Sequence, residues 1–399
     1  MQKNSDLDKW LLSACQYSNK IFSRDVDGIS CLKHLEDLYS VIISCSSNAT
    51  NNQLIQICVV MYTYCEIANN WGQWFSLAKR IPNIEGTGYE GLFYYGLGRM
   101  YEEHEDLELS SKFHKKGIYF SKSVNHNEKW LALNCQGLGI VLFRLNLEIS
   151  IKYLLIAYHL FKKNKEAYFF GCTCSDIGGC YYRLKRLKSI RGHSPLIRQS
   201  FMEIFLYKKN IYKNTIKSMK YYLEAIFIHL NHKYPWDLDR FFYSLGCTCL
   251  DSKITLFLSL LSFKISLKES KKNQSIRYEA LSNYGLGRYY YQTHKYQKAL
   301  NLLNVADITY EEYLGFSNYY SENKFNIGVM ICNTYLKLNN QEVSLQYFNT
   351  LELLAKGEIS SRHSIPNRIN QYNSLLNLAK KLNNEISISF WQDAIKNYC

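Results

Sequence analysis

Apolar residues recur at three- and four-residue spacing along most of the chain, which is the period of an amphipathic helix. The stretch that follows Lys295 shows this well. Its apolar face consists of Tyr296, Ala299, Leu300, Leu303 and Ala306. Period-two alternation next to Asn-Gly or Asp-Gly turns is hard to find. Only 4 prolines occur in 399 residues, so long helices need not be interrupted. The pattern predicts an all-α protein.

A short motif recurs within these predicted helices. The sequence Tyr-Gly-Leu-Gly-Arg occurs at 95–99 and again at 284–288, and related stretches occur at 134–139 and 242–246. The last glycine of the motif recurs after 41 residues in both halves of the chain (139 − 98 and 287 − 246). Steps of this size are typical of stacked helix hairpins. We therefore expect repeated hairpins with small residues where the two helices cross, namely Gly287 against Ala299 and Cys332 against Ser344.

The best-preserved copy resembles the tetratricopeptide repeat, a helix hairpin with a Leu-Gly pair and a tyrosine on its first helix and alanines on its second. The matching residues are Leu286, Gly287, Tyr290, Ala299, Leu303 and Ala306, although the closing proline of that pattern is missing. The spacing is similar to the subclass with repeats of roughly 40 residues. The segment 70–77 resembles the arrays attached to bacterial signal-transduction NTPases. The resemblance implies a right-handed α-solenoid of antiparallel helix pairs, whose first helices line a concave groove.

Three proline-containing breaks, at 193–195, 234–237 and 364–367, interrupt the repeat pattern. We therefore expect five segments, with capping helices at both ends because the ends of a solenoid must be covered. They are N-terminal capping helices at 1–53, a first array at 54–182, a basic and irregular helical segment at 183–239, a second array at 240–358 and a C-terminal capping pair at 359–399.

Motifs that would indicate catalysis or a cofactor are absent from the sequence. A phosphate-binding G-x-x-x-x-G-K-[ST] loop does not occur, and the Gly-x-Gly pairs at 96/98, 137/139 and 285/287 fall inside predicted helices instead of following a strand. The 13 cysteines include no C-x2-C pair. His229 and His232 share a helix face without a clustered carboxylate or thiolate. The sequence therefore predicts no catalytic residues, no metal, no cofactor and no enzymatic activity.

The formal net charge is +14, a balance that attracts acidic proteins, membrane surfaces or nucleic acid without naming the partner. No stretch is long and apolar enough to span a bilayer, and the N-terminus carries no signal-peptide core. These features predict a cytoplasmic or organelle-interior location. The 34 tyrosines and the abundance of lysine, asparagine and isoleucine indicate an A/T-rich genome, so the plastid stroma is included among the compartments.

Basic residues are concentrated between Arg183 and Lys220, where Glu203 is the single acid and tyrosines are interleaved. This combination suits nucleic-acid phosphates and bases, an acidic protein face, or peripheral contact with anionic lipid. A solvated surface is the alternative. The candidate residues, called the basic patch below, are Arg183, Lys185, Arg186, Lys188, Arg191, Arg198, Lys208, Lys209, Lys213, Lys217 and Lys220.

The resemblance to tetratricopeptide repeats implies a second candidate surface, on the first helices. Transferred to the copies in this chain, the groove-facing positions are Tyr95, Arg99, Glu102, Gln136, Phe143, Tyr243, Tyr284, Arg288 and Tyr291. Arg99 and Arg288 both follow the motif glycine, and a guanidinium binds a partner's carboxylate through two parallel hydrogen bonds. Alternatively, the two arginines cover the floor of the groove with their methylene groups.

Stacked hairpins offer a large concave surface and no reactive centre, so the sequence favours a scaffold or assembly factor that binds a protein or peptide in the groove. One alternative is a peptide-responsive sensor, similar to the helical-repeat quorum-sensing receptors of Gram-positive bacteria. Residues 1–60 contain no convincing helix-turn-helix, which disfavours a DNA-binding version. The other alternative is RNA binding through 183–220, although the copies are too irregular for a code of one base per repeat.

Overall fold

The computed structural model describes residues 2–21, 28–68, 71–123, 127–191, 201–234, 236–250, 252, 254–313, 318–357 and 365–398. In this part of the chain every regular element is a helix, with 18 α-helices, one short 3-10 helix and no strand. The all-α prediction is confirmed. None of these described helices is both long and apolar enough to cross a membrane. The residues form two compact units, Met1–Asp237 and Leu238–Cys399.

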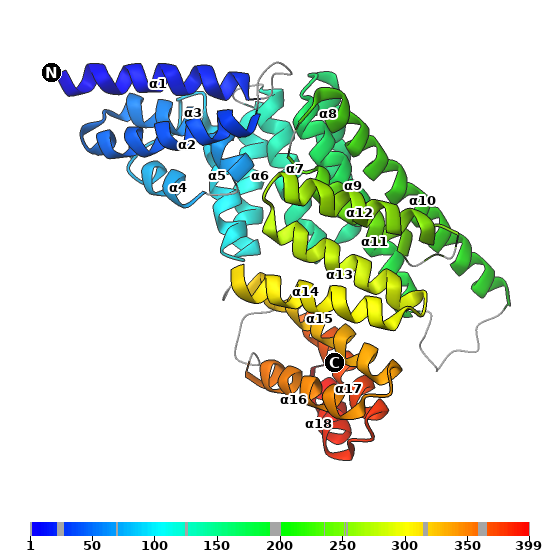
Figure 1. Cartoon of the computed structure of the whole chain (residues 1–399). Helices are drawn as coiled ribbons and strands as arrows, with labels where there is room; N and C mark the ends of the chain where they lie inside the picture. Colours follow the sequence, from blue (N-terminus) through cyan, green and yellow to red (C-terminus); the bar gives the residue numbers. More distant parts are fainter. Residues whose placement is uncertain are drawn as a thin grey trace. The chain divides into compact units, whose positions relative to one another are not determined.

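Each unit is a stack of helix pairs in which consecutive helices run antiparallel (Figure 1), as the sequence predicts. The first unit contains α1 (Gln2–Lys20), α2 (Gly28–Cys45), η1 (Ser46–Asn48), α3 (Asn51–Ala68), α4 (Gly72–Ala78), α5 (Glu90–Glu103), α6 (Leu107–Ser123), α7 (Glu128–Leu145), α8 (Leu147–Lys163), α9 (Ala167–Arg191) and α10 (Phe201–His232). The second contains α11 (Leu238–Leu250), α12 (Leu256–Lys272), α13 (Ile276–Gln292), α14 (Tyr296–Tyr313), α15 (Asn318–Lys337), α16 (Gln341–Gly357), α17 (Ile365–Lys381) and α18 (Glu385–Tyr398).

Residues 183–239 are expected to be helical with an interrupted repeat, and most of their described part is helical. They provide the last turns of α9 and the whole of α10, which is the longest described helix at 32 residues and packs along α9. This segment therefore forms a helix pair like its neighbours in the first unit. The division of the chain into five segments stays a prediction.

Six turns between helices close in the same way although their sequences differ. In each, a residue other than glycine adopts the left-handed conformation, with φ between 54° and 60°. These residues are Glu105, Lys165, Gln274, His294, Asn339 and Asn383. The N–H of the next residue donates to the carbonyl five positions earlier, as from Lys295 to Tyr290 at 2.8 Å. This is the Schellman closure, which normally uses glycine. A seventh such turn follows α10, where Lys233 has φ of 54° and the Tyr234 N–H donates to the His229 carbonyl at 3.0 Å.

Small residues let the two helices of a pair approach each other where they cross. The Ser344 hydroxyl on α16 donates to the Cys332 carbonyl on α15 at 3.0 Å. A Cβ added to Gly287 on α13 would lie 3.4 Å from the carbonyl oxygen of Ala299 on α14. Both crossing pairs predicted from the sequence are therefore confirmed. The serine-to-carbonyl bond recurs in the first unit, in the pairs Ser110 with Gly98 and Ser150 with Gly139.

The recurring glycines also make room for a buried imidazole. His114 on α6 is fully buried, and its ring lies between Gly98 on α5 and Gly137 on α7. A Cβ added to these glycines would lie only 2.5 Å and 2.3 Å from atoms of the ring. Gly98 therefore lets α6, the second helix of its own pair, approach α5. Gly137 lets α6, which is the second helix of the preceding pair, approach α7.

The second unit repeats this arrangement with a phenylalanine. The ring of Phe263 on α12 lies between Gly246 on α11 and Gly285 on α13, 2.6 Å and 2.5 Å from the positions their Cβ atoms would take. His114 and Phe263 are called the inserted rings below. Each inserted ring needs a glycine on the first helix at either side, and these two glycines are 39 residues apart (137 − 98 and 285 − 246). The glycines that follow at a step of 41, Gly139 and Gly287, instead lie against Leu154 and Leu303.

Gly137→Ala is expected to lower the free energy of unfolding of the first unit by about 1–3 kcal/mol, because the added methyl overlaps a ring that Gly98 confines from the other side. Gly179→Ala, on α9, is the matched control. There the nearest atom to the added Cβ is the Tyr222 hydroxyl oxygen at 3.5 Å, so the higher helix propensity of alanine should stabilise by about 0.5–1 kcal/mol. Urea unfolding followed by circular dichroism measures both, and equal shifts would contradict the packing argument.

Candidate partner-binding surface

The first helices of successive pairs contact each other in both units. In the first unit α5 contacts α7 and α7 contacts α9, and in the second unit α11 contacts α13 and α13 contacts α15. Successive second helices make no comparable contact in the described part of the chain. The first helices are therefore closer together than the second helices, which places them on the inner side of each stack. The resemblance to tetratricopeptide repeats implies a groove on this side.

In the first unit, the groove positions on α5 form a charged cluster with Glu66 of α3. The Arg99 guanidinium places Nη1 2.6 Å from Oε2 of Glu102 and Nε 3.6 Å from Oε2 of Glu66. The Tyr95 hydroxyl donates to the same Glu66 oxygen at 2.6 Å. Little of this cluster reaches solvent, since the side chains of Arg99 and Glu66 are 13% and 15% exposed.

The charge of Arg99 is compensated inside the chain. Burial acts to lower the pKa of the guanidinium, but Glu102 and Glu66 outweigh burial and raise this pKa well above its usual range. Burial, together with Glu66, raises the pKa of the Tyr95 hydroxyl. Arg99 therefore stays charged and Tyr95 stays neutral at any pH where the protein is folded. A partner's carboxylate has to displace Glu102 or Glu66 to bind Arg99.

Gln136 and Phe143, the groove positions on α7, join α7 to α9. The side-chain amide of Gln136 donates from Nε2 to Oδ2 of Asp176 at 2.9 Å. The Arg183 guanidinium lies over the Phe143 ring, 4.8 Å from its centroid, and its Nη1 donates to the Phe143 carbonyl at 2.8 Å. These two groove positions thus hold neighbouring first helices together, and one residue of the basic patch takes part in the contact.

The groove positions of the second unit are aromatic and cationic. The Arg288 guanidinium lies 5.6 Å from the centroid of the Tyr284 ring, and the Tyr291 ring packs edge-on against Tyr296 at 5.5 Å. Burial raises the pKa values of the Tyr243 and Tyr291 hydroxyls, so both remain neutral hydrogen-bonding groups. Tyrosine and arginine together are the residues favoured at protein interfaces.

The structure places the described residues of the basic patch in different surroundings. Lys185 is only 6% exposed, and the Lys217 ammonium lies 4.8 Å from the centroid of the Tyr181 ring. Lys213 and Lys220 are exposed. Residues of the patch whose side chains lie outside the described part of the chain are Arg186, Lys188, Arg191, Arg198, Lys208 and Lys209. Together with Arg183, the described members therefore include two half-buried cations, one buried cation and two exposed ones.

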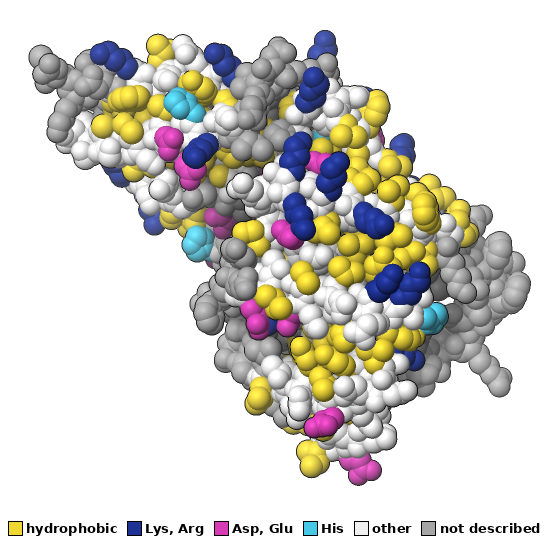
Figure 2. All heavy atoms as spheres, viewed as in Figure 1, with side chains coloured by type: hydrophobic (Ala, Val, Ile, Leu, Met, Phe, Trp, Pro, Cys, Tyr) yellow, Lys and Arg dark blue, Asp and Glu magenta, His cyan; other side chains and the backbone are white. Residues whose placement is uncertain are grey.

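Exposed apolar side chains line α10, a feature that the sequence analysis did not single out. They are spaced three, four or seven residues apart and are 50–66% exposed; they are Tyr212, Ile216, Leu223, Phe227 and Leu230. Hydrophobic side chains also gather over α12 on the face shown in Figure 2, where Phe257 is 70% exposed. An exposed apolar stripe that follows one helix, as on α10, is typical of an interaction surface. In the described part of α10, exposed apolar side chains are thus at least as prominent as exposed lysines.

Comparisons with known proteins place the fold. No family model matches the sequence, and no curated protein matches it. A Rap protein complexed with Competence and Sporulation Factor superposes with a TM-score of 0.63 at 13% identity, covering 98% of both chains. Aspartyl phosphate phosphatase F from Bacillus subtilis gives 0.55 at 12% identity, over 99% of this chain and 93% of that one.

A Signal Transduction ATPase with Numerous Domains protein from Pyrococcus horikoshii, which has a tetratricopeptide repeat sensor, gives 0.53 at 14% identity. The match covers 98% of this chain and 63% of that one. These likenesses, with the observed helix pairs, show that the chain has the tetratricopeptide-like helical-repeat fold, as the resemblance in the sequence implied.

Proposed function

We propose that this chain binds a peptide or protein partner on the first-helix surface of its hairpins, and acts as a non-enzymatic scaffold, assembly factor or regulatory receptor. The observation that carries the proposal is the mutual contact of the first helices, which brings tyrosine and arginine side chains to the inner side of each unit. Such side chains supply most of the binding free energy at protein interfaces.

The class of partner is supported by the fold comparison. A helical-repeat chain of the same length and fold was solved in complex with Competence and Sporulation Factor, so this architecture can hold a separate molecule. Among the three roles, the regulatory receptor has this support in addition to the surface composition. A scaffold binds a larger partner on the same surface, so the size of the captured partner distinguishes the two roles.

We assign the main contact to the second unit. In the first unit Arg99 neutralises Glu102 and Glu66, so its role is largely internal. In the second unit the groove positions combine the Arg288 guanidinium, which packs on the Tyr284 ring, with the neutral hydroxyls of Tyr243 and Tyr291. A partner with an acidic side chain or a free C-terminal carboxylate fits this surface.

A photocrosslinking amino acid at Tyr291, at the end of a first helix, is expected to capture the partner in native lysate. The same residue at Phe257, on the outer helix α12, should not. Nuclease treatment should leave the adduct unchanged, and its size distinguishes a short peptide from a folded protein. Arg288→Met should reduce capture about tenfold, the effect of losing roughly 1.4 kcal/mol, while Arg288→Lys tests whether charge alone is sufficient.

Two results would contradict the proposal. An adduct that disappears with nuclease would identify nucleic acid as the ligand and the basic patch as the candidate binding surface. Capture from Phe257 in place of Tyr291 would identify the exposed apolar residues of α12 as the binding surface instead of the first helices.

A further inference from the structure

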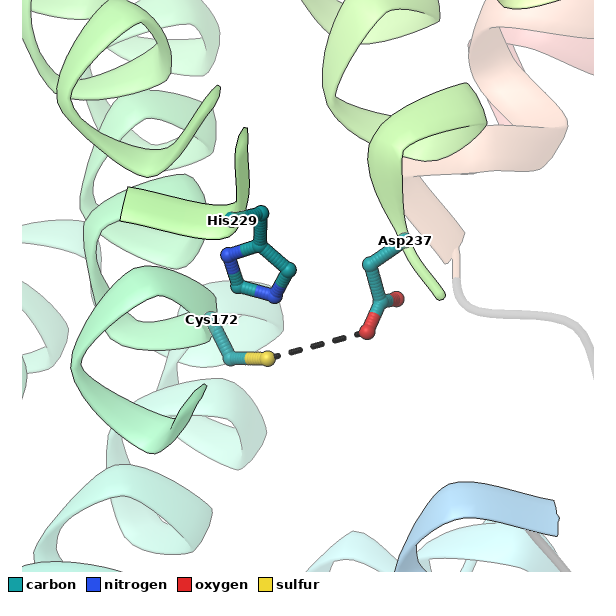
Figure 3. Close-up of side chains that lie close together, drawn as sticks. All are labelled: Cys172, His229 and Asp237. Carbon is teal, nitrogen blue, oxygen red and sulfur yellow. Dashed lines mark hydrogen bonds between the residues drawn. The ribbon is translucent and has the colours of Figure 1, made fainter. Parts of the chain in front are cut away.

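Three potential metal ligands of the first unit converge at a point that the sequence does not reveal. Cys172 lies near the start of α9, His229 lies in the last turn of α10, and Asp237 follows α10 as the final residue of the unit. One ligand atom of each residue lies within 4.8 Å of the other two, and Figure 3 shows the three side chains pointing toward one another. Cys172 and His229 are buried, and Asp237 is half-buried.

The imidazole of His229 is held in the orientation that a metal ligand needs. Its Nδ1 lies 3.2 Å from the carbonyl oxygen of Ala225, one turn earlier on α10, so this nitrogen carries the proton and donates to the carbonyl. The lone pair is then on Nε2, the ring nitrogen turned toward Cys172 and Asp237 (Figure 3). Histidine ligands of metals characteristically donate their other N–H to a backbone carbonyl in this way.

The ring of His229 has little freedom to turn. It packs against the rings of Tyr168 and Tyr234, with centroids 5.6 Å and 5.3 Å away. On the side of α9 it lies against Gly171, where an added Cβ would be 2.4 Å from Cε1. The glycine of the first Gly-Cys-Thr-Cys tetrad therefore admits the ring beside the cysteine that follows it.

The carboxylate of Asp237 is likewise positioned by its surroundings. The backbone of Asp237 is in the left-handed region, with φ of 67°, a conformation that aspartate tolerates better than most residues. Its Oδ2 accepts a hydrogen bond from the Tyr168 hydroxyl at 3.0 Å and another from the Cys172 thiol at 3.8 Å. Tyr168 thus contacts both the carboxylate and the imidazole.

We propose that Cys172, His229 and Asp237 form a site for one Zn²⁺ ion, with water as the fourth ligand. Thiolate sulfur, imidazole nitrogen and carboxylate oxygen are the donors that zinc binds in proteins. With bonds of about 2.3 Å to sulfur and about 2.0 Å to oxygen, these two atoms of a tetrahedral site lie about 3.5 Å apart. The 3.8 Å between Cys172 Sγ and Asp237 Oδ2 needs only a small side-chain adjustment. Binding releases the thiol proton of Cys172 to solvent.

The ion joins two parts of the first unit that are distant in sequence. Cys172 and Asp237 are 65 residues apart, so a bound ion ties the end of α10 and the last residue of the unit to α9. Two negative ligands balance the double positive charge, which offsets the cost of burying the cation. The role is structural, and the site lies in the first unit, whereas the main partner contact is assigned to the second unit.

Titration of the full-length, reduced, metal-free chain with Co²⁺ tests the site. Tetrahedral Co²⁺ bound to a thiolate gives visible absorption and a near-ultraviolet charge-transfer band. We expect one Co²⁺ per chain, displaced by Zn²⁺. Cys172→Ser should remove the charge-transfer band, and Asp237→Asn should weaken metal binding at least about tenfold. Zn²⁺ should raise the Tm of the native chain and not that of Asp237→Asn.

The second cysteine of the same tetrad provides the matched control. Cys174 is fully buried on α9 and, two residues along the helix, points to a different side from Cys172. Cys174→Ser should therefore keep the Co²⁺ spectrum. Asp237→Asn preserves the shape of the carboxylate and carries the test if a core substitution unfolds the chain, which circular dichroism detects. Absence of the spectrum in the native chain, its survival in Cys172→Ser, or its loss in Cys174→Ser would overturn the proposal.

Discussion

Replacing His114 by phenylalanine is expected to remove much of the loss of stability that the native first unit shows in acid. Burial lowers the pKa of His114 from 6.5 to about 3, Arg99 acts in the same direction, and a bond to Asn134 opposes both. Below pH 6.5 the unfolded chain therefore takes up a proton at this histidine that the folded chain does not bind. The free energy of unfolding must fall as the pH falls, by about 1.4 kcal/mol per pH unit, until the pH nears 3. Between pH 6.5 and 4 the loss is roughly 3 kcal/mol.

Phenylalanine is the substitution that the chain itself uses at the equivalent place, since Phe263 is the inserted ring of the second unit. In His114→Phe the part of the acid-dependent loss that His114 causes should disappear. A small cost remains at neutral pH, because Asn134 Oδ1 loses a long hydrogen bond of 3.4 Å. Urea unfolding at pH 7.5 and 4.5, followed by tryptophan fluorescence, measures the difference between variant and native chain at each pH.

The reciprocal change Phe263→His is the control for this prediction. It should introduce the same loss of stability in acid into the second unit, whose tryptophan is Trp391. A native chain and a His114→Phe variant that differ equally at both pH values would show that His114 does not titrate with the lowered pKa.

Replacing Arg99 by methionine is expected to destabilise the first unit by about 3–5 kcal/mol, because two carboxylates then remain in a largely buried position without their cation. Glu102 lies 2.6 Å and Glu66 3.6 Å from the guanidinium. Urea unfolding of Arg99→Met and of the native chain at pH 7.5 measures the size of the effect.

Arg288→Met is the matched control, because Arg288 occupies the same position of the Tyr-Gly-Leu-Gly-Arg motif. Its guanidinium packs on the Tyr284 ring, and a cation over an aromatic ring contributes about 0.5–2 kcal/mol. We therefore expect a larger loss of partner binding from Arg288→Met than from Arg99→Met. If Arg99→Met leaves the first unit as stable as the native chain but abolishes binding, Arg99 acts on a partner and not within the fold.

Features that depend on neighbours along the chain could be predicted from the sequence alone. Apolar spacing and the scarcity of proline determine the helices, and small residues about twelve positions apart determine where the two helices of a pair cross. Gly287 with Ala299 and Cys332 with Ser344 could be identified for this reason. The Gly-x-Gly pairs could be assigned to helix packing because they recur inside helical periodicity. The left-handed turn residues were not identified, because none of the six is a glycine.

Which side chains of different pairs meet could be seen only in the folded chain. Tyr95 reaches Glu66 across 29 residues, and Cys172 reaches Asp237 across 65, with no local pattern to mark either partner. Helical periodicity states which face of a helix is apolar, but it does not determine the rotation of that helix about its axis or its displacement along its neighbours. Those quantities are set by how rings such as His114 fit between glycines of adjacent pairs. The pairing of Arg99 with two carboxylates and the convergence of Cys172, His229 and Asp237 therefore follow from packing between helix pairs. This packing cannot be derived from a single sequence.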